Sequence, residues 1–138
     1  KLNNKFPPFL NLGTLGFHFG MQGVQFTATS TVAENQTLSF PMYVHSIPNN
    51  NDNQDIVSMG CNAALLTKKV LENTYQVLTV QLMALLQAVD YLKCSDRMSA
   101  KTLAVYQAAR KIFPVFVEDQ PKYRDLIALR EFLEKDAI

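Results

Sequence analysis

Residues 62–92 read NAALLTKKVLENTYQVLTVQLMALLQAVDYL, and this stretch decides the fold. It lies within residues 61–113, which contain neither glycine nor proline, so no residue in it breaks a helix. We therefore predict one helix over Asn62–Leu92, about thirty residues long and at least twice the usual length in a globular domain.

The second half of this helix is apolar on nearly every face. Polar residues at helical spacing mark only the first half, at Lys69, Glu72, Asn73 and Gln76, whereas few interrupt the pattern from Val77 onward. A helix that is apolar all round has to be buried all round. The 138 residues hold too few other elements to cover it. We expect further chain or other subunits to surround it, and the sequence to be a piece of a longer protein.

Shorter helices are predicted on both sides of the long one. A stretch rich in small residues and threonines predicts a first helix over residues 19–35. Ser99 is a typical N-cap residue for a helix over residues 100–112. Pro114 would end that helix, because the residue before a proline avoids the helical conformation.

A last helix is predicted near the C-terminus. Asp119, with Pro121 nearby, is typical of a helix start, and the pattern continues through about Glu134. Its apolar face is formed by Leu126, Leu129 and Leu133.

The fold class predicted from these patterns is all-α, because no stretch alternates convincingly as a strand does. A long buried central helix carries shorter flanking helices, as part of a larger helical bundle. We divide the chain into residues 1–60 (irregular segment, helix and loop), 61–94 (long core helix) and 95–138 (C-terminal helices).

Composition excludes several classes of function. With 13 basic and 12 acidic residues the formal net charge is +1, which favours neither nucleic acid nor a membrane surface as a partner. Cys61 and Cys94 would lie roughly 50 Å apart along the helix, too far to form a disulfide, so we expect a reducing, cytoplasmic setting. His18 and His45 belong to no metal-ligand pattern, and we expect no metal site.

One loop is unusually rich in amides and acids, the NNNDNQD of residues 49–55. Such side chains form local hydrogen bonds with the backbone, so this composition is typical of a solvated surface loop. Composition and spacing alone leave the chain a helical segment without an assigned role.

Four ordered stretches give the chain a family resemblance. They are KLNNKFPPFLN (1–11), AENQTL with SIP (33–38 and 46–48), NQDIVSMG followed by CNAALLTKKVLEN (53–73), and ARKIFPVFVEDQPKYRDLIAL (109–129). On these motifs the chain resembles the C-terminal portion of the histidine, phenylalanine and tyrosine ammonia-lyases and the related aminomutases. The resemblance covers nearly the whole chain.

The resemblance implies elimination of ammonia from an aromatic amino acid to give an arylacrylate. The family's electrophile is a methylidene-imidazolone formed from an Ala-Ser-Gly tripeptide, which occurs nowhere in these 138 residues. The family's tyrosine base and carboxylate-binding arginine also lie upstream. We therefore expect no catalytic residue in this segment, no activity from it alone, and a cytoplasmic homotetramer as the parent protein.

The resemblance also suggests substrate-binding residues. Gln54 and Asn53 fall at loop positions that face substrate and cofactor in the family, and Asn50 falls where tyrosine lyases have an asparagine near the ring. The alternative role for each is hydrogen bonding inside the loop. Gln54 replaces a glutamate of typical histidine lyases, and a neutral amide favours a phenyl or phenol ring over an imidazole.

Other residues near these motifs have structural roles as their expected function. We expect Asp55 to bond backbone groups where the loop meets the helix, and Ser58 to cap that helix. Phe19, Met21 and Gln22 fall near a pocket-lining stretch of the family, but core packing is expected for each. Two alternative functions stay open: an aminomutase of the same fold, or a non-catalytic helical interaction module.

Overall fold

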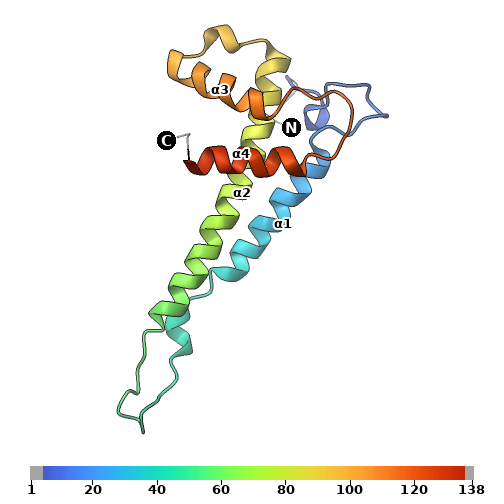
Figure 1. The fold of residues 1–138 in the computed structure, drawn as a ribbon. Helices are drawn as coiled ribbons and strands as arrows, with labels where there is room; N and C mark the ends of the chain where they lie inside the picture. The colour runs from blue at the N-terminus through green and yellow to red at the C-terminus, as the bar shows by residue number, and fades with distance from the viewer. Residues whose placement is uncertain (1–4, 136–138) are drawn as a thin grey trace.

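The computed structural model describes residues 5–135 (Figure 1). The ends of the first and last predicted regions, residues 1–4 and 136–138, lie outside the described residues. The described residues form four α-helices and three short 3-10 helices, with two isolated bridges and no strand. The all-α prediction is therefore confirmed. No helix of this part of the chain is both long and apolar enough to span a bilayer.

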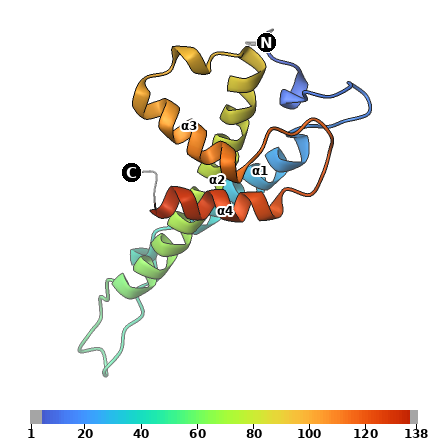
Figure 2. The ribbon, with the colours of Figure 1, turned by 45° about the horizontal axis from the view of Figure 1, so that its top comes forward.

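The spine of the structure is α2 (Gly60–Leu92). It starts two residues before the predicted Asn62 and ends where predicted. α1 (Gln22–Leu38) packs along α2, running in the opposite direction. α4 (Tyr123–Lys135) crosses α2 near its middle, and α3 (Ala100–Ile112) folds back beside the C-terminal end of α2 (Figures 1 and 2).

Three short 3-10 helices complete the described structure. Two of them, η1 (Pro8–Leu10) and η2 (Met42–His45), pack on α2, and η3 (Ser95–Arg97) connects α2 to α3.

The hydrophobic core lies around the second half of α2. Met83 and Leu86 of α2 are buried there against Ala109 of α3, Phe113 and Leu129 of α4. The sequence predicts this half of α2 to be apolar. Three separate segments pack on it because burying that apolar surface is favourable.

The opposite face of α2 is not covered by the described residues. Leu71, Leu78 and Leu85 recur every seven residues, and their exposed fractions are 56%, 45% and 54%. Burial on every side is therefore not achieved within this chain. The expectation that cover comes from outside it stays a prediction.

α3 follows its sequence signals closely. It spans the predicted residues, and the Ser99 Oγ accepts a hydrogen bond from the Thr102 amide at 3.2 Å, as an N-cap does. The helix gives way to extended backbone at Phe113, immediately before Pro114.

Asp119 has a different role from the predicted one. Its carboxylate oxygens accept hydrogen bonds from the amides of Phe19 at 2.7 Å and Gly20 at 3.0 Å, just before α1. Gly20 has a φ of +58°, and the turn there delays α1 to Gln22. The first helix thus starts and ends three residues later than predicted, and α4 starts only at Tyr123.

A polar cluster joins α2 to α3 and to the segment after it. Gln87 is fully buried, and its amide donates to the Phe116 carbonyl at 3.0 Å and accepts from Arg110 at 3.1 Å. Arg110 also pairs with Asp90, whose carboxylate accepts a hydrogen bond from Tyr106. The cluster pairs the buried amide of Gln87, whereas the buried Nε of Arg110 has no hydrogen-bond partner among the described residues.

Asp90 also changes the titration of its phenol partner. The hydrogen bond from Tyr106 to Asp90, followed by burial, raises the pKa of Tyr106 above its ordinary value of 10.0. The pKa of Tyr106 is therefore higher in the folded state than in the unfolded state. The stabilisation that Tyr106 gives the fold is complete below its unfolded-state pKa and is lost as pH rises through its folded-state pKa.

Candidate functional site

The candidate site is the loop of residues 46–59, which joins η2 to α2. It projects beyond the ends of α1 and α2, away from the core (Figures 1 and 2). Two backbone hydrogen bonds close it: the Asn49 amide donates to the Gln54 carbonyl at 3.1 Å, and the Gln54 amide donates to the Asn49 carbonyl at 3.4 Å. The loop therefore has two arms and a tight tip between them.

The tip is a run of left-handed backbone. Asn50, Asn51 and Asp52 have φ values of 51°, 57° and 61°. Among non-glycine residues, Asn and Asp tolerate this conformation best because their short polar side chains bond locally. The amide-rich composition thus has a structural cause, apart from any contact with a ligand.

The two arms are joined a second time by the Ser46 side chain. Its hydroxyl oxygen accepts a hydrogen bond from the Val57 amide at 2.7 Å and donates to the Asp55 carbonyl at 3.5 Å. Ser46 directly follows η2, which packs on α2. The loop is therefore tied to the helical body through this residue.

The structure brings the three predicted binding residues together at the loop tip. Asn50, Asn53 and Gln54 are all exposed. Within residues 5–135, the side-chain amides of Asn50, Asn53 and Gln54 make no hydrogen bond, so bonding inside the loop does not occupy them. Asn50 also has a backbone role, because its carbonyl accepts from the Asn53 amide at 3.2 Å. Their binding of a substrate stays a prediction.

The predicted roles of Asp55 and Ser58 are wrong. The N-cap position of α2 is Met59, in left-handed backbone with a φ of 53°, and no side chain caps it. In the described part of the chain, the Asp55 carboxylate has no hydrogen-bond partner, and it is the backbone carbonyl of Asp55 that Ser46 contacts. The serine that organises this loop is therefore the one at its entrance.

The prediction for residues near α1 holds in part. Met21 is buried in the core, with 5% of its surface exposed, as predicted. Phe19 is 64% exposed, so core packing is wrong for it, and its backbone amide donates to the Asp119 carboxylate. Gln22 is half-buried at the start of α1.

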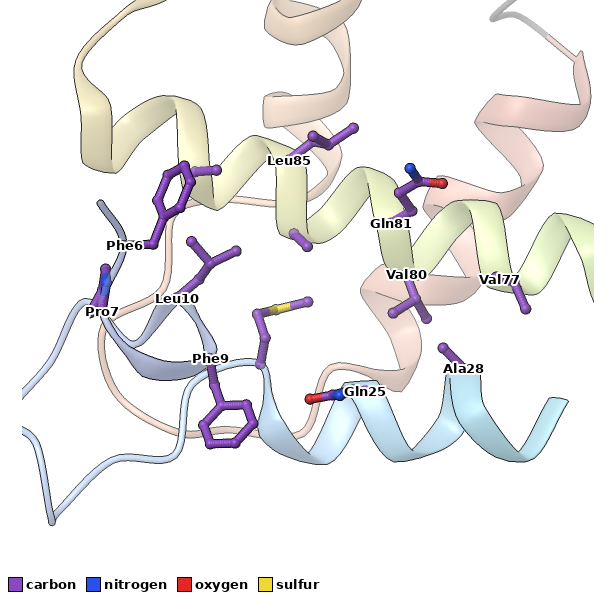
Figure 3. A pocket seen from close by; sticks show the side chains of 13 residues that line it. Phe6, Pro7, Phe9, Leu10, Gln25, Ala28, Val77, Val80, Gln81 and Leu85 are labelled. Atoms are coloured by element: carbon purple, nitrogen blue, oxygen red, sulfur yellow. The ribbon is translucent and has the colours of Figure 1, made fainter. Parts of the chain in front are cut away.

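A separate apolar cavity of about 700 Å³ lies between the N-terminal segment, α1 and α2 (Figure 3). Leu10 and Val80 point into it from opposite sides, and no residue of the loop lines it. Among the described residues, its only polar side chains are Gln25 and Gln81, and neither can exchange a proton at neutral pH. The part of this cavity that the described residues line therefore holds no general acid or base.

No group of His, Cys, Asp and Glu residues within the described range has the geometry to hold a metal ion. Cys61 and Cys94 are both free thiols, one at each end of α2. His45 packs against Phe40, with ring centroids 5.3 Å apart. The loop tip thus offers the neutral amides of Asn50, Asn53 and Gln54, with the exposed carboxylates of Asp52 and Asp55 beside them.

Comparison with known proteins identifies the family to which the chain is similar. A model of the aromatic amino acid lyase family matches residues 1–111. Tyrosine ammonia-lyase of Cupriavidus metallidurans is 34% identical over 99% of the chain, which covers 26% of that protein. Histidine ammonia-lyase 1 of Fusobacterium nucleatum is 36% identical, with 99% of the chain and 26% of that protein covered.

The fold agrees with the sequence match. The MIO-dependent tyrosine 2,3-aminomutase of Streptomyces globisporus is 38% identical over 94% of the chain and 24% of its own length. The crystal structure of tyrosine aminomutase from that organism superimposes with a TM-score of 0.89 over the same shares. The chain spans about a quarter of the length of the curated relatives it matches. From the family match and these relatives together, the chain belongs to the aromatic amino acid lyase family.

Proposed function

We propose that this chain is the C-terminal part of an ammonia-lyase that removes ammonia from an aromatic amino acid, and that the 46–59 loop supplies one wall of its substrate pocket. The observation that carries the proposal is the loop tip. It holds the side-chain amides of Asn50, Asn53 and Gln54 exposed and without partners among the described residues, on a backbone fixed by its own hydrogen bonds. Exposed amides without partners, carried on a backbone held by hydrogen bonds, are available to contact a ligand.

Gln54 supports a substrate with a phenyl or phenol ring. A carboxylate at this position could pair with an imidazole, whereas an amide forms neutral hydrogen bonds and carries no charge to desolvate beside an apolar ring. We therefore propose tyrosine or phenylalanine as the substrate ahead of histidine. Relatives named for tyrosine and for histidine are similarly close to this chain.

An aminomutase is the second candidate. It is favoured by the 38% identity to the tyrosine 2,3-aminomutase and by the superposition on tyrosine aminomutase. An aminomutase would return the ammonia to the substrate's β-carbon rather than release it. A non-catalytic interaction module is the third candidate. It would be favoured if the full-length parent showed no turnover.

The electrophilic cofactor cannot originate in this chain. A methylidene-imidazolone needs an Ala-Ser-Gly tripeptide, and none occurs in the 138 residues. We propose that the parent supplies the group from another part of its sequence, and we assign none of this chain's residues to it. The chain's own contribution is to contact and orient the substrate.

Self-association of the parent is proposed from α2. Leu71, Leu78 and Leu85 recur every seven residues along the helix and are each about half exposed, and soluble monomers rarely leave large apolar surfaces open. We propose a homotetramer. Two free thiols agree with a reducing compartment, which supports a cytoplasmic location.

The test is product analysis of the full-length parent with histidine, tyrosine and phenylalanine, and with the 138-residue chain assayed in parallel. We expect ammonia and an arylacrylate from the parent, with tyrosine or phenylalanine preferred, and no turnover by the chain alone. A β-amino acid product would establish the aminomutase instead. Absence of turnover by a correctly assembled parent, or turnover by the chain alone, would contradict the proposal.

A further inference from the structure

We propose that Ser46 is a positioning residue that sets where the Gln54 side chain lies, acting through the backbone and touching no substrate itself. The inference rests on the proposed function, because it concerns how the same loop is held.

The geometry carries this assignment. The Ser46 hydroxyl accepts from the Val57 amide at 2.7 Å and donates to the Asp55 carbonyl at 3.5 Å. Asp55 directly follows Gln54, so one of these bonds ends on the residue beside the proposed ring contact. The hydroxyl thereby joins the entry arm of the loop to its exit arm across nine and eleven residues.

The bonds matter because the loop has few other constraints. Asn49 and Gln54 exchange two backbone bonds at the tip, but residues 50–56 are all exposed. Ser46, by contrast, directly follows η2, which packs on α2. Loss of its hydroxyl would let the tip turn as a unit about its two ends.

A small displacement at the tip is expected to have a large effect on turnover. Catalysis depends on near-attack geometry, and a misplacement of about 1 Å can slow a reaction by up to roughly a hundredfold. For one lost hydroxyl bridge we expect kcat/KM to fall roughly tenfold, with kcat falling more than KM changes, because orientation rather than binding is impaired.

The test uses matched substitutions in the full-length parent. Ser46→Thr and Ser46→Val have the same shape and differ only in the hydroxyl. Ser39→Ala is the control, since the Ser39 hydroxyl donates to the Gln36 carbonyl at the end of α1, at 2.6 Å, and bonds no other group within residues 5–135. We expect kcat/KM close to that of the parent in Ser46→Thr and Ser39→Ala, and roughly tenfold lower in Ser46→Val. Amide exchange at Val57 should be about fivefold faster in Ser46→Val alone.

A double-mutant cycle separates positioning from a general loss of structure. If Ser46 acts through Gln54, then Ser46→Val has no further effect on kcat/KM once Gln54 is alanine. The same fold-loss in both backgrounds, or unchanged kinetics in Ser46→Val, would overturn the inference while the proposed function stands. If Gln54→Ala itself leaves activity intact, the pocket role of the loop fails, and the positioning role fails with it.

Discussion

Replacing Gln54 by glutamate in the full-length parent is expected to raise the histidine-to-tyrosine ratio of kcat/KM by roughly ten- to hundredfold. The reason is that a charged hydrogen-bond partner is worth about 1.5–3 kcal/mol in a desolvated site. An imidazole offers such a partner to the new carboxylate, whereas a phenol or phenyl ring does not. The measurement is kcat/KM for both substrates in the parent and the variant.

Two comparisons make the Gln54 experiment specific. Gln107→Glu introduces the same charge on α3, away from the loop, and should leave the ratio unchanged. Gln54→Ala should lower activity on every substrate. Burial raises the pKa of a carboxyl group, so the shift should be larger at higher pH. Equal ratios in the parent and Gln54→Glu, with both proteins assembled, would remove the support for a tyrosine or phenylalanine substrate.

Replacing Arg110 by alanine is expected to lower the free energy of unfolding by about 3–5 kcal/mol, because it leaves the mostly buried Asp90 carboxylate without its cationic partner, with only the Tyr106 hydroxyl among the described residues still bonded to it. Arg110 is 11% exposed and pairs with Asp90, and it also donates to Gln87 and to the Phe113 carbonyl. These groups lie where the C-terminal half of α2 meets α3 and the segment after it. Urea denaturation of the unsubstituted protein and of Arg110→Ala measures the difference in the free energy of unfolding.

Arg130→Ala is the control for this experiment. Arg130 pairs with Glu134 one turn along α4, with both side chains about one-third exposed, at 32% and 34%. Such pairs contribute about 0.3–0.5 kcal/mol. A loss in Arg110→Ala no larger than in Arg130→Ala would show that the polar cluster does not stabilise the fold.

The helices that could be predicted from sequence were those with local signals. Absence of glycine and proline predicted α2 to within two residues, and Ser99 with Pro114 predicted both ends of α3. α1 and α4 were displaced because Asp119 bonds the backbone at Phe19 and Gly20, a hundred residues away. No local pattern encodes a contact over that separation.

The sequence predicts that the candidate site is a loop, but it does not predict the loop's backbone conformation or its hydrogen bonds. The density of Asn and Asp predicts a turn, and the family resemblance selects Gln54, Asn53 and Asn50. Three consecutive left-handed residues and the Ser46 bridge arise from how the two arms meet, which depends on the placement of η2 against α2. Ser58 was predicted as the structural serine for its position before α2, whereas the hydrogen bonds belong to Ser46.

The most direct test of the loop's role is amide hydrogen exchange across residues 46–59 of the assembled parent, with and without a saturating arylacrylate product. A pocket wall loses access to water when the pocket is filled, so we expect exchange in this loop to slow on binding, while the exposed end of α4 near Lys135 stays unchanged. Binding that leaves exchange in residues 46–59 unaltered would contradict the assignment of this loop to the substrate pocket.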